Sequence, residues 1–283
     1  MSRPAESRYT RELTALVLIP VAVWLVGWSP QWVFNIAIGL IAVLALHEFL
    51  ILGRKKGFHV PIVLCLVVAA FIIAAFVLDE VSVEVGIFLT LLVIPASYVF
   101  NRKVSLDDAL PSSAIAVMAT MYVGMLAGSL VRLRHDFTVG PDLVFFLLLV
   151  VWLGDAGAYY VGKRFGKRKL SPRISPKKTV EGLIGGVLTS VVTAIVIHYT
   201  FFPEFALPHA IVIGIILSVA GVIGDLAESM WKRSAAVKDS GTLIPGHGGL
   251  LDRFDSILFT APILYIYWAI THQGATTLNI ITG

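Results

Sequence analysis

Nine stretches of this chain are long and apolar enough to cross a lipid bilayer, and this feature restricts the possible folds more than any other. A spanning helix needs about 20 mostly apolar residues. Because the bilayer core offers the backbone no hydrogen-bond partner, each stretch is expected to be helical. The stretches are residues 13–28, 31–52, 60–78, 83–100, 109–131, 141–162, 181–202, 208–231 and 253–272. We therefore predict an all-α, polytopic membrane protein with about nine transmembrane helices. The first two stretches, joined by Ser29-Pro30, are either two spans or one re-entrant pair.

The composition argues against several other classes of protein. Hydrophobic residues make up 57% of the chain and charged residues 14%, whereas soluble domains average about 25% charged. The net charge of +4 comes without an aromatic-interleaved basic patch, so we expect no nucleic-acid partner. The single cysteine, Cys65, lies in an apolar stretch and makes no disulfide framework.

The distribution of basic residues predicts the orientation in the membrane. If all nine stretches cross, 20 of the 22 Lys and Arg residues fall on one side, and Arg132 and Arg134 fall on the other. The positive-inside rule places the richer side in the cytoplasm. We therefore expect a cell inner (plasma) membrane protein with a cytoplasmic N-terminus, a periplasmic C-terminus and an active site that faces the cytoplasm. Residues 1–135 would form an N-terminal region of about five spans. Residues 136–283 would form a catalytic region with two cytoplasmic loops, 163–179 and 232–252.

Four acidic residues lie inside apolar stretches: Glu48, Asp155, Asp225 and Glu228. Charged groups are costly in a membrane, so they mark functional sites more often there than elsewhere. Asp225 and Glu228 are three residues apart and would share a helix face. For Glu48, beside His47, we expect a structural pairing with a basic residue or a helix end.

The loop that follows Asp225 is dense in polar groups. Residues 246–249 read Gly-His-Gly-Gly, and such a backbone can turn sharply and present N–H groups to phosphate oxygens. Asp252 and Asp255 then begin the last helix, on one face. Carboxylates beside a phosphate site repel it unless a cation lies between them, which favours Mg²⁺.

The other cytoplasmic loop interleaves basic residues with glycines and hydroxyls. Its segment 175–179, Ser-Pro-Lys-Lys-Thr, places donors just ahead of a helix start, where the helix dipole favours anions. Its earlier segment, 163–169, is either part of the site or a patch that binds anionic lipid.

The segment from Ser229 to Asp255 resembles the signature of the phosphatidate cytidylyltransferase (CDP-diacylglycerol synthase) family. That signature reads Ser, two residues, Lys-Arg, four residues, Lys-Asp, a small residue, then Pro-x-His-Gly-Gly and Asp-Arg-x-Asp. This sequence agrees at nearly every position, with Trp231 where the family usually has an aliphatic residue or Phe. Residues 175–182 and the surroundings of Asp155 are also similar to the family, so the resemblance covers the C-terminal half. The N-terminal stretches match only as spans.

The resemblance implies that CTP and phosphatidate give CDP-diacylglycerol and pyrophosphate, a step of phospholipid biosynthesis, with Mg²⁺ as cofactor. Family members are thought to hold the metal through the acids that match Asp225 and Asp252. Asp255 and Glu228 are further candidate ligands, and a monovalent cation such as K⁺ is a candidate second ion. We assign to catalysis Asp225, Asp252, Lys232, Arg233, Lys238 and Asp239. We assign to substrate binding Lys177, Lys178, Thr179, Ser229, His247, Gly248, Gly249, Arg253 and Asp155.

Two alternatives stay open. One is a cytidylyltransferase for a different lipid phosphate, such as an ether lipid. The other is a transporter or channel that uses the intramembrane acids, although the polar residues crowd at the cytoplasmic end. We also expect a homodimer in the lipid bilayer. Gly124 and Gly128 would let helices pack closely, within or between subunits.

Overall fold

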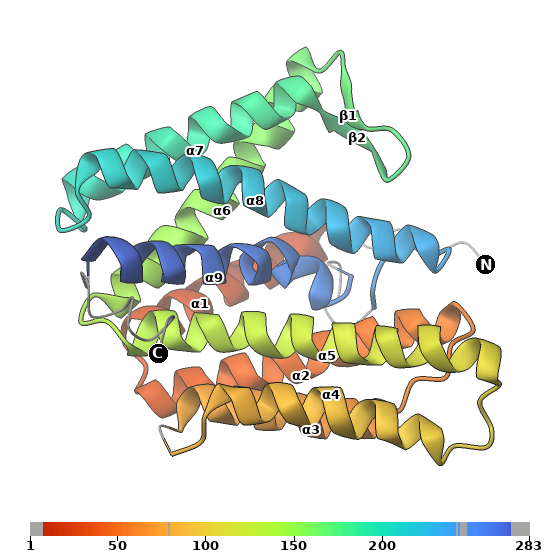
Figure 1. Ribbon diagram of the computed structural model, residues 1–283. Coiled ribbons are helices and arrows are strands. Elements are labelled where there is room, and N and C mark those ends of the chain that lie inside the picture. Colours follow the sequence, from red (N-terminus) through yellow and green to blue (C-terminus); the bar gives the residue numbers. More distant parts are fainter. Residues whose placement is uncertain (1–7, 79, 242, 244–247, 273–283) are drawn as a thin grey trace. The chain divides into compact units, whose positions relative to one another are not determined.

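The computed structural model describes residues 8–272 apart from 79, 242 and 244–247, and side chains from residue 16 onward. Over these residues the chain forms nine α-helices and one two-stranded β-hairpin. The helices are α1 (Arg8–Gly27), α2 (Gln31–Lys55), α3 (Ile62–Val77), α4 (Val83–Val99), α5 (Leu106–His135), α6 (Gly140–Phe165), α7 (Val180–Thr200), α8 (Leu207–Ser234) and α9 (Leu251–His272). Each predicted stretch lies mainly within one helix, so the all-helical prediction is confirmed (Figure 1).

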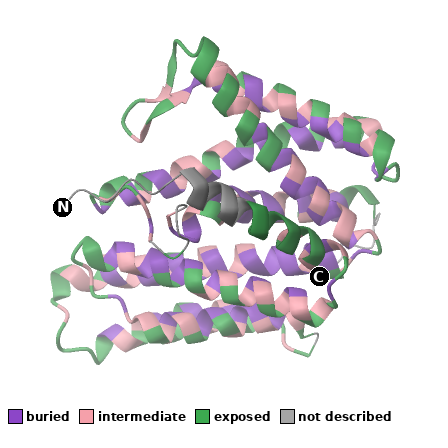
Figure 2. Cartoon of the chain, turned by 180° about the vertical axis from the view of Figure 1, so that it is seen from behind, coloured by how far each residue is buried: buried purple, intermediate pink, exposed green. Residues whose placement is uncertain are grey.

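Six of the described helices are long and apolar enough to cross a membrane: α2, α5, α6, α7, α8 and α9. The described part of α1 and the whole of α3 and α4 are shorter apolar helices. Exposed and buried residues alternate around most of the helices (Figure 2), and many exposed residues are large and apolar. Such a surface suits lipid better than water.

The chain divides into two compact units. Unit 1 comprises residues 1–131 and 231–254, and unit 2 comprises residues 132–230 and 255–283. The loop between α8 and α9 therefore belongs to the same compact unit as the N-terminal helices. The functional division predicted after residue 135 stays a prediction.

Unit 1 is built around the helices α2 to α5. Ile72 of α3 is fully buried and packs against two glycines, Gly86 of α4 and Gly124 of α5. Gly128, one turn further along α5, leaves room for the ring of Phe76. Gly124 and Gly128 thus pack helices closely, as predicted, and they do so within the chain.

Unit 2 contains a closely packed helix pair, α6 and α7. Small residues on both helices let the backbones approach, and Ser190 Oγ of α7 donates a hydrogen bond of 3.0 Å to the carbonyl of Val150 on α6. A Cβ atom at Gly157 would overlap Thr189 Oγ1, and one at Gly185 would lie 2.5 Å from Val161 Cβ. The connection between these two closely packed helices carries the hairpin described next.

The connection between α6 and α7 folds into an antiparallel hairpin of β1 (Lys169–Ser171) and β2 (Ser175–Thr179). This hairpin was not predicted from the sequence. Glu181, in the first turn of α7, accepts hydrogen bonds from the backbone N–H groups of Lys167 (2.9 Å) and Arg168 (3.1 Å). These bonds tie the entry of the hairpin to the helix that follows it.

The glycine contacts between α6 and α7 give a first testable prediction. In Gly157→Ala the added methyl group would overlap Thr189 Oγ1 and lie 2.7 Å from Thr189 Cβ. We expect the free energy of unfolding in detergent to fall by about 1–3 kcal/mol, the usual range for overpacking. Gly39→Ala is the matched control, because it makes the same change inside a helix and its nearest new neighbour, Ile73, lies 3.9 Å away. Equal thermal midpoints for the two variants would contradict the close packing of α6 and α7.

Candidate functional site

The first polar cluster, in unit 2, joins Asp225 of α8 to Lys178 of β2. Lys178 Nζ lies 2.7 Å from Asp225 Oδ2, and Ser229 Oγ donates a hydrogen bond of 3.2 Å to Asp225 Oδ1. The Asp225 side chain is 34% exposed and that of Lys178 is 24% exposed. Both charges are therefore half-buried, and a ligand can still reach them.

Asp225 and Lys178 line a cavity of about 580 Å³. This volume lies in the range of small-molecule and cofactor sites. The lining combines cationic groups, two acids and apolar surface. Its charged and aromatic members are Asp155, Tyr159, Lys163, Lys177, Lys178 and Asp225. Such a lining suits a ligand that carries both phosphate and an apolar part.

The hairpin and the start of α7 place the lysines at this cavity. Thr179 is the N-cap of α7, and its Oγ1 accepts a hydrogen bond of 3.1 Å from the Gly182 N–H. Gly162 and Gly182 pack so closely here that a Cβ at either would lie 3.0 Å from Thr179 Oγ1. The prediction that residues 175–179 lie just ahead of a helix start is confirmed, and they do so as a strand.

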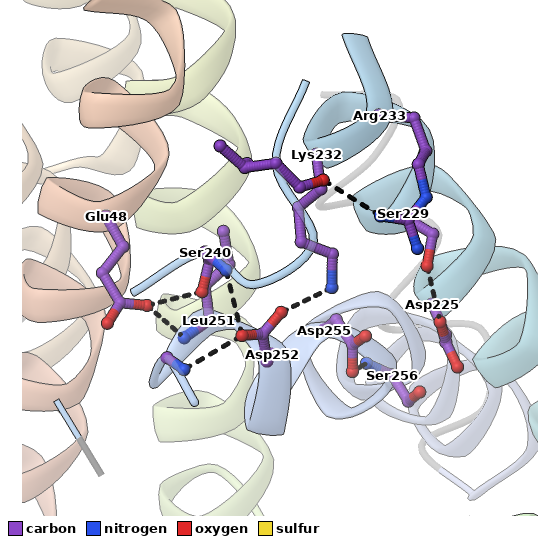
Figure 3. A network of polar contacts seen from close by, with 12 residues as sticks. Glu48, Asp225, Ser229, Lys232, Arg233, Ser240, Leu251, Asp252, Asp255 and Ser256 are labelled. Carbon is purple, nitrogen blue, oxygen red and sulfur yellow. Dashed lines mark hydrogen bonds and ion pairs between the residues drawn. The ribbon is translucent and has the colours of Figure 1, made fainter. Parts of the chain in front are cut away.

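The second polar cluster, in unit 1, is centred on Asp252 in the first turn of α9 (Figure 3). Its Oδ1 accepts a hydrogen bond from Lys232 Nζ at the end of α8. Its Oδ2 accepts hydrogen bonds from the backbone N–H groups of Ser240 (3.0 Å) and Gly249 (2.9 Å). The Lys232 and Asp252 side chains are 10% and 8% exposed. The buried Asp252 carboxylate therefore fixes Lys232 and also both ends of the loop between α8 and α9, at Ser240 and Gly249.

Trp231, the one departure from the family signature, belongs to an aromatic cluster in the same unit. Its ring stacks on Phe49 with centroids 4.6 Å apart, and it meets Tyr122 edge-on at 5.0 Å. The indole therefore packs the end of α8 against α2 and α5, immediately before Lys232.

The acid Glu48 of α2 also binds this loop. Its Oε2 accepts hydrogen bonds from Ser240 Oγ (2.8 Å) and from the N–H of Leu251 (2.9 Å), the first residue of α9. The expectation of a structural pairing with a helix end is confirmed. Nothing in the spacing of the residues indicates that this helix end is that of the signature segment.

The remaining predicted residues differ in their surroundings. Glu228 lies on α8 three residues after Asp225 and is fully buried, whereas Asp225 lines the cavity. Asp255 is buried and accepts a 2.6 Å hydrogen bond from the N–H of Ser256. Arg233, Lys238 and Arg253 are exposed, and Asp239 is half-buried. Gly248 has a φ of +82°, which favours glycine. His247 lies outside the described residues.

The described residues contain no group of three or more His, Cys, Asp or Glu side chains that could hold a metal ion by themselves. Mg²⁺ needs no such group, because it takes one or two carboxylates and completes its shell with phosphate oxygens and water. Asp225 is suited to such sharing, because its half-exposed carboxylate borders a cavity. Asp252 already accepts three hydrogen bonds from the protein.

Comparison with known proteins agrees with the resemblance seen in the sequence. The profile of the "Cytidylyltransferase family" matches residues 9–271. The phosphatidate cytidylyltransferase of Bacillus subtilis (strain 168) is 35% identical over 269 residues, which cover 92% of this chain and 96% of the relative. That of Staphylococcus haemolyticus (strain JCSC1435) is 36% identical over 264 residues, or 90% of this chain and 97% of the relative. The match extends through both polar clusters and all nine described helices, and this chain belongs to the cytidylyltransferase family.

Proposed function

We propose that this protein is a phosphatidate cytidylyltransferase that converts CTP and phosphatidate to CDP-diacylglycerol and pyrophosphate. The observation that carries the proposal is the near full-length match to proteins of that name. The geometry supports it, because a cavity with cationic, acidic and apolar lining suits a lipid phosphate better than a fully water-soluble metabolite.

The reaction asks mainly for charge neutralisation and positioning. A phosphate oxygen of phosphatidate attacks the α-phosphorus of CTP, and the bond from that phosphorus to the bridging oxygen of pyrophosphate breaks. The nucleophile is already ionised near neutral pH, so no strong general base is needed. Bringing two anions together is the main barrier, and preorganised cations lower it.

Each cluster supplies such cations. Lys178, held 2.7 Å from Asp225, and the neighbouring Lys177 border the cavity and would bind phosphate oxygens. Lys232 at the end of α8, fixed by Asp252, would do the same beside the signature loop, the connection between α8 and α9 (residues 235–250). Mg²⁺, when bound by Asp225 together with substrate phosphate, would neutralise charge on the phosphate groups. The ion pairs with Asp225 and Asp252 would hold the two lysines in place for substrate.

The orientation is part of the proposal. We infer nine crossings, with the active site in the cytoplasm and the C-terminus in the periplasm of an inner-membrane protein. The support is the uneven distribution of Lys and Arg between alternate connections. A homodimer stays a proposal, and Gly124 and Gly128 add no support because they pack inside the chain.

The test is direct. Purified protein in phosphatidate-containing vesicles, given Mg²⁺ and base-labelled CTP, should release pyrophosphate and transfer the label to lipid in equal amounts. An ether-lipid phosphate offered in place of phosphatidate tests the acceptor. Substrate flux into sealed vesicles without nucleotide would favour a transporter. No CTP-dependent product with any lipid phosphate would overturn the proposal.

A further inference from the structure

Glu48 combines three properties that packing alone does not explain. The residue is 5% exposed, lies on α2 far from the signature segment in the sequence, and accepts two hydrogen bonds from that segment with one oxygen atom (Figure 3). A buried carboxylate is costly unless hydrogen bonds and charges compensate it. An apolar side chain of similar size would fill the same space without that cost.

The backbone of the loop is shaped around this carboxylate. A Cβ atom at Gly249 would lie 2.5 Å from Glu48 Oε2, and one at Gly241 would lie 2.6 Å from Glu48 Cδ. Any residue other than glycine at either position would push the loop away from α2. The two glycines on opposite sides of the loop thus enclose one acid.

The bonds of Glu48 and of Asp252 reach the same short segments. Ser240 donates its hydroxyl to Glu48 and its N–H to Asp252. On the other side of the loop, Gly249 N–H binds Asp252 and Leu251 N–H binds Glu48. Leu251 begins α9, so the charge of Glu48 also interacts favourably with the helix N-terminus. Glu48 therefore supports both segments that bring donors to Asp252.

We propose that Glu48 is a positioning residue, which anchors both ends of the signature loop on α2 and thereby fixes Asp252 and its partner Lys232. Glu48 acts through these residues and does not touch substrate. The inference rests on the proposed function for its kinetic readout alone. Its structural readout, the attachment of Ser240 and Leu251 to α2, is independent of any activity.

The experiment compares three variants of the full-length protein. Glu48→Met keeps the length of the side chain and removes the acceptor. Glu48→Gln keeps one acceptor oxygen, and His47→Met makes the control change at the exposed neighbour on the same helix. The attachment of Ser240 to α2 is read from the rate of tryptic cleavage after Lys238, an exposed residue two positions earlier in the chain. Turnover is read as separate kcat and KM values for CTP.

We expect Glu48→Met to be cleaved after Lys238 at least about tenfold faster than the wild type, because Ser240 then lacks its bond to α2 and the chain beside it detaches more often. Its kcat should fall by about 10²-fold, as expected for a displacement of about 1 Å in the catalytic groups. Glu48→Gln should recover most of both properties, and His47→Met should match the wild type.

A folded Glu48→Met protein with wild-type cleavage after Lys238 would overturn the proposal, whatever its activity. So would a Glu48→Gln variant that behaves like Glu48→Met. If Glu48→Met does not fold, Ser240→Ala removes one of the two hydrogen bonds without altering α2, and unchanged cleavage in that variant would overturn the proposal equally. A wild-type protein without CTP-dependent product would refute the proposed function and leave the cleavage result to decide on Glu48.

Discussion

Asp225→Asn should lower kcat by at least about 10²–10³-fold while the protein remains folded. The amide keeps the shape of the side chain and can still accept the hydrogen bond from Ser229, but it removes the negative charge that pairs with Lys178 at 2.7 Å. It also removes the carboxylate best placed at the cavity to share Mg²⁺ with substrate phosphate. Lys178 would then no longer be fixed, and the charge balance of the cavity would shift by one unit.

The measurement is steady-state formation of CDP-diacylglycerol over a range of Mg²⁺ concentrations, together with the thermal midpoint in detergent. Asp142→Asn is the matched control, since it makes the same change in the first turn of α6, outside the cavity lining. Near-normal kcat in Asp225→Asn at ordinary Mg²⁺ would remove this residue from the metal site. A thermal midpoint in Asp225→Asn well below that of Asp142→Asn would instead indicate a structural role for Asp225.

The helices could be predicted because hydropathy reports burial in lipid, but their ends could not. The structure extends α8 to Ser234, three residues beyond the predicted end, and this extension carries Lys232 and Arg233. It likewise begins α5 at Leu106, where Asp107 and Asp108 favour the positive end of the helix dipole. A helix can continue beyond the apolar stretch when the polar residues that follow also favour helix. A search for apolar stretches does not detect such an extension.

The hairpin between α6 and α7 was missed for a related reason. Its strands of three and five residues are polar and show no alternation of apolar and polar positions. Tertiary contacts form it, since Glu181 binds the backbone of Lys167 and Arg168. Lys177 and Lys178 were nevertheless selected from the sequence, because basic residues before a helix start are recognisable without the strand.

The residues of the candidate site could be predicted from the sequence, but the ion pairs and hydrogen bonds between them could not. Asp225 and Lys178 were both selected, but their ion pair joins segments 47 positions apart in the sequence. Glu48 was recognised as a costly intramembrane acid, yet its partners lie 192 and 203 residues away in the sequence. A single sequence shows which groups need partners, whereas only the fold shows which partners they find.

Asp252→Asn should differ from Asp225→Asn in a way that separates the two clusters. Asp252 accepts from Lys232 on one oxygen and from two backbone N–H groups on the other. An amide has one acceptor oxygen and one NH₂ donor. In either orientation the NH₂ would face a donor, the Lys232 ammonium or the N–H groups of Ser240 and Gly249. We therefore expect the loss of the buried ion pair with Lys232 and a weaker attachment of Ser240 and Gly249 to α9. The free energy that holds these contacts together should fall by about 3–5 kcal/mol.

Two readouts test this difference. Turnover should fall by about 10²–10³-fold, as in Asp225→Asn. Tryptic cleavage after Lys238 should accelerate in Asp252→Asn and stay at the wild-type rate in Asp225→Asn, because Asp225 binds Lys178 of β2 and Ser229 of α8, both of which lie outside the loop. Asp107→Asn, an exposed change in the first turn of α5, serves as the control. An inactive Asp252→Asn protein with a fully protected loop would place this carboxylate in direct contact with metal or substrate. Normal activity with a protected loop would remove it from the reaction, since neither of its proposed roles would then be needed.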